Sequence, residues 1–109
     1  MNFNEYQKLA NDLISEDGKK EPLLNGALGL AGESGEVADL LKKHLFQKHD
    51  LSEEKLIEEL GDVLWYIAEC CYGLNVPLEE IAKKNIEKLH HRYHGDKFQA
   101  KYSLNRSED

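Results

Sequence analysis

Apolar residues recur at helical spacing along almost the whole chain. Residues 2–16 carry them at positions 3, 6, 10, 13 and 14, which predicts a first helix there. The same period predicts a second helix over about 22–48. A third helix would begin at a cap formed by Asp50 or Ser52 and end at about residue 74, and a fourth would run from 77 to about 93. No alternating strand pattern or repeat interrupts them. We therefore expect an all-α fold of four helices.

Glycine and proline mark the ends of these helices. Gly18 and its polar neighbours end the first helix, Pro77 suits the first position of the fourth, and Gly95 ends it. This punctuation predicts one domain over 1–95 and a polar tail over 96–109.

The second and third helices are long and joined by only a few residues, which predicts an antiparallel hairpin. The apolar residues of the third helix spread over more than one narrow seam: Leu56, Leu60, Val63, Leu64, Ile67, Cys71 and Leu74. Faces this wide on so short a chain predict a homodimer or homotetramer. A compact monomeric bundle is the alternative.

Composition and charge narrow the function. The 109 residues are 40% hydrophobic and 32% charged, as expected of one soluble domain, and the formal net charge is −7. That charge argues against binding nucleic acid, but not against a nucleotide, because a metal ion can supply positive charge. Without a leader-like N-terminus or a membrane-spanning apolar run, we expect a cytoplasmic protein. Adjacent Cys70 and Cys71 suit reduced packing residues.

Four acids stand out against this background. Glu33 and Glu36 lie in GESGEV, and Glu59 and Asp62 lie in EELGDV, so each pair is spaced i, i+3 on one side of a helix. Glu33 is at the centre of an apolar stripe where packing alone would favour Leu or Ala, and no Lys or Arg shares that stripe. Two such pairs facing each other across a hairpin need a divalent cation to offset their repulsion.

Ligand chemistry indicates which cation. Carboxylate oxygens suit Mg²⁺, with Mn²⁺ as an alternative. A di-iron bundle would carry Glu-x-x-His, and a zinc site CxxC or HExxH, none of which occurs. The His90–His94 pair has ligand-like spacing but lies at a helix end, and we interpret His44 as a satisfied, partly buried side chain.

The fourth helix carries polar residues that suit phosphate. Asn85 shares an inward stripe with apolar residues, and Lys88 and Arg92 flank it. These three could hold phosphate oxygens beside a metal. The alternative is that Lys88 and Arg92 are solvated or pair with helix acids.

Two stretches, GLAGESGEVADLLKK and EELGDVLWYIA, resemble the MazG-like nucleoside triphosphate pyrophosphohydrolases of the all-α NTP-PPase superfamily. That family's signature is ExxE, a spacer and ExxD, and NIEKLHHRY resembles its fourth-helix pattern. The resemblance covers about residues 5–106. It implies an oligomeric four-helix bundle and Mg²⁺-dependent hydrolysis of (d)NTP to (d)NMP and pyrophosphate, as in nucleotide-pool house-cleaning.

The resemblance also implies roles for single residues. The metal ligands would be Glu33, Glu36, Glu59 and Asp62, and one acid of this set would act as the general base. We choose Glu36 for that role because it lies at the edge of the apolar stripe. Phosphate contacts would come from Asn85, Lys88 and Arg92, with Lys43 near the metal. The base would lie in an apolar slot between protomers, near Trp65, Tyr66 and Gln7, although Trp65 is equally well explained as core.

One departure and two alternatives remain. Relatives often have Pro where this chain has His94, and the ending SLNR, with Ser103 and Arg106, resembles a tail that folds back toward a site. The alternative functions are hydrolysis of another phosphoanhydride, such as a phosphoribosyl-ATP-like substrate, and a non-catalytic helical interaction module. Intact acids at all four positions argue against the module.

Overall fold

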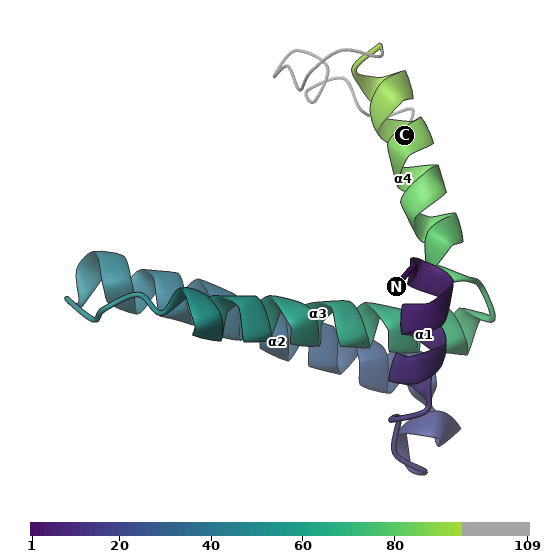
Figure 1. Cartoon of the computed structure of the whole chain (residues 1–109), viewed down its shortest axis with the longest axis horizontal. Coiled ribbons are helices and arrows are strands. Elements are labelled where there is room, and N and C mark those ends of the chain that lie inside the picture. The colour runs from purple at the N-terminus through teal and green to yellow at the C-terminus, as the bar shows by residue number, and fades with distance from the viewer. Residues whose placement is uncertain (95–109) are drawn as a thin grey trace. The chain divides into compact units, whose positions relative to one another are not determined.

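The computed structural model describes residues 1–94, which form helices and no strand. The elements are α1 (Phe3–Asn11), the short 3-10 helix η1 (Gly18–Lys20), α2 (Pro22–Phe46), α3 (Glu53–Leu74) and α4 (Leu78–Arg92) (Figure 1). The predicted all-α class is confirmed. The chain divides into two compact units, 1–78 and 79–109. The predicted tail, its start at Gly95, and Ser103 and Arg106 lie outside the described residues.

Local side chains account for where the long helices begin and end. Pro22 occupies the first turn of α2. Ser52, not Asp50, caps α3, because its hydroxyl accepts a hydrogen bond from the Lys55 N–H at 3.2 Å. Asn75 ends α3 in the left-handed conformation, with φ at 56°.

The first helix is shorter than predicted. Its expected span was 2–16, but α1 ends at Asn11 and the chain then turns. The turn lets Ile14 become buried, with 6% of its surface exposed, and the Ser15 hydroxyl accepts a hydrogen bond from the Gly18 N–H at 2.9 Å. Burial of one apolar side chain and a local hydrogen bond therefore outweigh continuation of the helical period.

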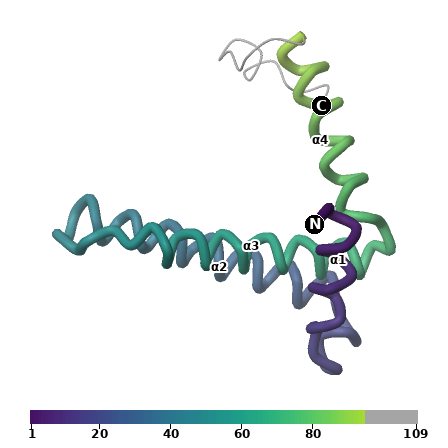
Figure 2. Tube along the Cα trace, in the orientation of Figure 1, coloured from purple at the N-terminus to yellow at the C-terminus, as the bar shows by residue number. Residues whose placement is uncertain are grey.

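Helices α2 and α3 pack along each other in opposite directions (Figure 2). Gly26 of α2 lies against Cys70 of α3, whereas Glu33, further along α2, lies near Glu59, earlier in α3. A Cβ atom at Gly26 would lie 2.8 Å from the Cys70 sulfur and 3.1 Å from its backbone nitrogen. Close approach of the two helices at this level therefore requires glycine.

Side-chain hydrogen bonds hold helix α1 against α3 and against the residues that follow α3. The Trp65 indole N–H donates to the Ala10 carbonyl at 3.0 Å. The Gln7 amide donates to the Val76 carbonyl at 3.0 Å and accepts from the Leu78 N–H at 2.6 Å. Gln7 therefore ties α1 to the turn that precedes α4.

A buried carboxylate joins α2 to α3 near the opposite end of the pair from their connecting loop. Glu69 is only 2% exposed, and the Asn25 side-chain amide donates to it at 2.7 Å. An isolated buried carboxylate is costly, so this hydrogen bond offsets part of its desolvation. The burial of Glu69 could not be predicted from the sequence, because its spacing in α3 does not distinguish it from a solvated acid.

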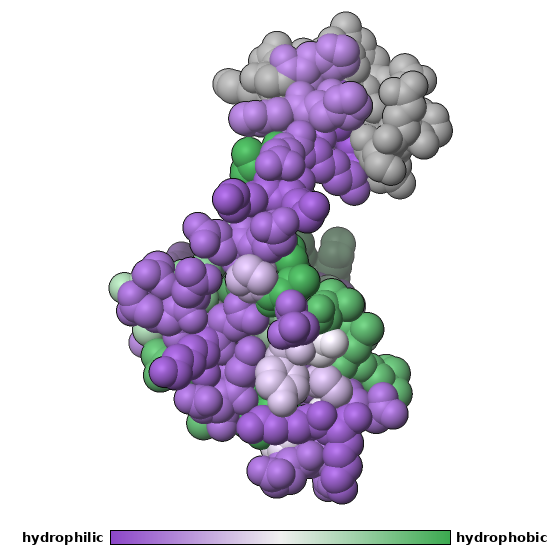
Figure 3. All heavy atoms as spheres, turned by 90° about the vertical axis from the view of Figure 1, so that its right-hand side faces the viewer, coloured by the Kyte–Doolittle hydropathy of each residue, from purple (hydrophilic) through white to green (hydrophobic). Residues whose placement is uncertain are grey.

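Large apolar side chains also remain at the surface of the first unit (Figure 3). Those more than half exposed include Leu13, Leu28, Leu45, Ile57, Leu60 and Leu74. They extend over several helix faces, and apolar surface of this kind is typical of interaction sites. Within residues 1–94, no helix combines the length and apolar character needed to cross a bilayer.

Candidate metal centre

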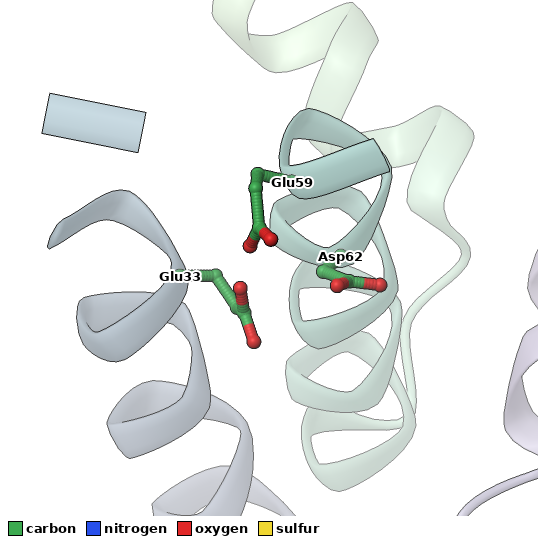
Figure 4. Close-up of side chains that lie close together, drawn as sticks. All are labelled: Glu33, Glu59 and Asp62. Carbon is green, nitrogen blue, oxygen red and sulfur yellow. The ribbon is translucent and has the colours of Figure 1, made fainter. Parts of the chain in front are cut away.

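Three carboxylates meet between α2 and α3. Glu33, Glu59 and Asp62 each offer an oxygen, and these oxygens lie within 4.8 Å of one another. In Figure 4 Glu33 extends from α2 toward α3, and its carboxyl group faces that of Glu59. Glu33 and Glu59 are half-buried. We call these three residues the carboxylate cluster.

Helix geometry explains why these side chains meet. Glu59 and Asp62 are three residues apart, so they project from one side of α3. Glu33 shares the half-buried face of α2 with Leu30 and Val37. Glu33 therefore lies in the packing stripe of α2, where the sequence pattern predicted it.

The surroundings of Glu33 raise the pKa of its carboxyl group from the ordinary 4.5 to about 7. The largest cause is a hydrogen bond with the Glu59 side chain, followed by burial and by repulsion from Glu59, Asp62 and Glu36. Without a cation, the cluster thus retains a proton close to neutral pH. A metal ion would displace that proton.

The donor set fits a hard divalent cation. All three groups are carboxylates, which suit Mg²⁺ or Mn²⁺. Because Mg²⁺ binds oxygen at about 2.1 Å, two of its ligands lie no more than about 4.2 Å apart. Oxygens within 4.8 Å of one another need only small side-chain rotations to reach that spacing.

Glu36 and Lys43 lie on α2 outside this cluster. Glu36 is exposed and is not one of the three gathered carboxylates, although its charge acts on both Glu33 and Lys43. The Lys43 ammonium lies 2.8 Å from the Asp39 carboxylate, and this hydrogen bond is the main cause that raises the pKa of Lys43. The metal and base roles of Glu36, and the phosphate role of Lys43, stay predictions.

The predicted phosphate contacts belong to α4. Asn85 and Lys88 are exposed, and Arg92 is half-buried with its guanidinium 5.8 Å from the centre of the Tyr93 ring. Leu78, on the same predicted stripe as Asn85, is buried. The roles of Asn85, Lys88 and Arg92 in binding phosphate stay predictions.

The histidines take no part in the carboxylate cluster. The His44 ring nitrogen Nδ1 lies 2.9 Å from the His49 carbonyl, so His44 has a hydrogen-bond partner as expected, but it is exposed rather than partly buried. Neither His44 nor His90 belongs to a group with metal-binding spacing in the described part of the chain.

An apolar cavity of about 590 Å³ lies between α1 and α3, and Asp62 of the carboxylate cluster forms part of its wall. We call it the aromatic cavity, because Tyr6 and Trp65 line it together with Leu9 and Leu13. Burial, and then the charge of Asp62, raise the pKa of the Tyr6 hydroxyl. Tyr6 was not predicted to lie near the site, and its sequence signal was only a place in an apolar stripe.

Two residues predicted to line a base slot are now placed. Trp65 lines the aromatic cavity, and its N–H donates to the Ala10 carbonyl of α1. Its role in lining a base slot stays a prediction. Gln7 instead lines a separate cavity of about 620 Å³, together with Asn11 and Asn75.

Comparison with known proteins agrees with the acid motifs. The sequence model of the MazG nucleotide pyrophosphohydrolase domain matches residues 23–95, which include both motifs and α4. The chain is 35% identical over 101 residues to the Gene 37 protein of Mycobacterium phage L5, with 84% of this chain and 89% of that protein covered. No solved structure matches the chain.

The raised pKa of Glu33 predicts how the metal-free protein responds to pH. Unfolded Glu33 loses its proton near 4.5, whereas folded Glu33 keeps it to about 7, so the free energy of unfolding falls as pH rises between these values. Glu33→Gln should remove this decrease in the free energy of unfolding, because the amide does not titrate and can still donate a hydrogen bond to Glu59. In EDTA, we expect its melting temperature to exceed that of the parent at pH 8 but not at pH 5.

Glu58→Gln is the matched control, because Glu58 is an exposed acid next to Glu59. We expect it to follow the parent at both pH values. If Glu33→Gln raised the melting temperature equally at pH 5 and pH 8, the raised pKa of Glu33 would not be the source of the difference.

Proposed function

Because the chain belongs to the MazG nucleotide pyrophosphohydrolase family, we propose that it hydrolyses (d)NTP to (d)NMP and pyrophosphate with Mg²⁺, or Mn²⁺ in its place. The observation that carries this proposal is the convergence of Glu33, Glu59 and Asp62 between α2 and α3. We assign it to nucleotide-pool house-cleaning in the cytoplasm.

In the proposed reaction, water attacks the α-phosphorus, the bond to the bridging oxygen breaks, and pyrophosphate leaves. Glu33, Glu59 and Asp62 would hold Mg²⁺, with Glu36 next to them on α2. Bound Mg²⁺ supplies positive charge for the triphosphate and lowers the pKa of water. The exposed carboxylate of Glu36 would accept the proton of the attacking water.

Phosphate binding requires cations and donors, which the acidic cluster lacks. Lys88 and Arg92 would supply charge-assisted hydrogen bonds and Asn85 an amide donor. Lys43 is near enough to Glu36 for their charges to interact, which supports a place close to the leaving phosphates.

We assign the nucleobase to the aromatic cavity. Its wall includes Asp62, so a base there would lie beside the phosphates that the cluster attracts. Tyr6 and Trp65 offer aromatic surfaces, but the Trp65 N–H is already bonded to Ala10 and cannot read a base edge. Such a cavity favours binding through stacking and apolar contact.

The protein is proposed to act as a homodimer or homotetramer. The exposed apolar faces of the first unit, including Leu28 and Ile57, support this assembly. The net charge of −7 supports a nucleotide substrate rather than nucleic acid.

Two alternatives make different predictions. A phosphoribosyl-ATP-like substrate contains the same kind of phosphoanhydride bond, so only a substrate panel separates it from a (d)NTP. A non-catalytic helical module would release no pyrophosphate from any of them. The three acids lie close together although their charges repel one another. Such a cluster is more typical of a catalytic site than of a helical interaction module.

The direct test measures pyrophosphate release from a panel of dNTPs, NTPs and a phosphoribosyl-ATP-like compound, with Mg²⁺ or with EDTA. We expect Mg²⁺-dependent release, and a loss of about 100-fold or more in kcat/KM for Glu33→Gln, because outer-shell changes alone often cost 10–100-fold. Glu58→Gln should retain parental activity. Release from no compound, or a Glu33→Gln variant as active as the parent, would exclude the enzyme.

Gly61 provides a separate test of the base assignment. It lines the aromatic cavity, and a Cβ atom there would meet nothing within 4 Å. Gly61→Leu should fill the cavity without disturbing the helix, raising KM for the nucleotide about tenfold or more. Gly61→Ala, which adds one methyl group, should change KM far less. A Gly61→Leu variant with parental KM would place the base elsewhere.

A further inference from the structure

Tyr66 of α3 lies on bare backbone of α2 at Gly29. A Cβ atom at Gly29 would lie 2.3 to 2.5 Å from three atoms of the Tyr66 ring, Cε1, Cδ1 and Cζ. No real Cβ atom tolerates such distances. Because Gly29 lies inside a helix, it is needed here for space rather than for an unusual backbone conformation.

This contact is the layer next to the carboxylate cluster. Gly29 lies four residues before Glu33 in α2, and Tyr66 lies four residues after Asp62 in α3. Four residues correspond to about 6 Å along a helix. A change in the distance between α2 and α3 at the Tyr66 ring should therefore also change the distance between the carboxylates, which lie about one helical turn away.

A second aromatic ring lies beside the Tyr66 ring. The centre of the Trp65 ring lies 5.2 Å from that of the Tyr66 ring, and the two planes are inclined by 31°. Trp65 is itself held by its hydrogen bond to Ala10 of α1. Burial, then the charges of Glu33, Glu69 and Asp62, raise the pKa of the Tyr66 hydroxyl, which agrees with a neutral ring close to these acids.

We propose that the Tyr66 ring, seated on Gly29, is the spacer that sets the separation of α2 and α3 at the carboxylate cluster, and thereby its affinity for a divalent cation. The inference rests on the proposed function, because it takes the cluster as a cation site. Mg²⁺ demands near-ideal octahedral geometry, so a small widening between helices weakens its binding. Tyr66 is thus a positioning residue and not a ligand.

The chain supplies matched controls for this idea. Gly32 and Gly35 lie in the same helix, and a Cβ atom at either would meet nothing within 4 Å. Gly→Ala brings the same gain in helix propensity at all three positions. Only at Gly29 does the added methyl group collide with the ring.

The test is a Mn²⁺ titration of the full chain by electron paramagnetic resonance, with helicity and oligomeric state checked for each variant. Gly29→Ala should weaken Mn²⁺ binding about tenfold or more, as outer-shell disturbances do. Gly32→Ala and Gly35→Ala should bind like the parent. Tyr66→Phe should also retain affinity, because the ring remains. Combining Gly29→Ala with Tyr66→Leu should restore most of the loss, because the methyl group takes space that the ring vacates.

A folded Gly29→Ala variant with parental affinity would overturn the spacer, and so would a Tyr66→Phe variant as weak as Gly29→Ala. If Gly29→Ala does not fold, Tyr66→Leu provides the test alone. We expect Tyr66→Leu to bind Mn²⁺ severalfold more weakly than Tyr66→Phe. Equal affinity of these two variants would overturn the proposal. A parent that binds no Mn²⁺ would overturn the proposed function and the spacer with it.

Discussion

Repulsion among carboxylates that two packed helices force together is the constraint on which the site depends. Glu33, Glu59 and Asp62 cannot all be ionised at close range without a free-energy cost. A hydrogen bond with Glu59, burial and this repulsion together raise the pKa of Glu33 to about 7. Either a proton or a cation relieves that cost. Packing of α2 on α3 therefore creates a cluster that favours positive charge. In the proposed function, the bound cation would attract the negative charge of a triphosphate.

The helix pair supports the cluster through contacts that lie in successive layers. Glu69 bonds Asn25 near one end of the pair, and Tyr66 covers Gly29 one turn from the carboxylates. Helix α1 contributes through the Trp65 hydrogen bond and forms the other wall of the aromatic cavity. Because Asp62 belongs to both the cluster and the cavity, α3 brings charge and an apolar surface to one place.

The sequence predicted the features that depend on helical period. Glu33 appeared as an acid in an apolar stripe, and the structure places it against Glu59. Features that depend on tertiary packing were not predictable. Burial of Ile14 accompanies the early end of α1. Glu69 is buried only because α2 and α3 pack closely together. Helical spacing alone also joined Glu36 to Glu33, and of these two the structure gathers only Glu33 with Glu59 and Asp62.

The most direct test of the cation site is isothermal titration calorimetry of Mg²⁺ binding in buffers with different ionisation enthalpies. If Mg²⁺ displaces the proton of Glu33, binding should release about one proton per chain at pH 6 and close to none at pH 8.5. Glu33→Gln should abolish the release. Mg²⁺ binding without proton release at pH 6, or release that persists in Glu33→Gln, would contradict a cation site built on Glu33.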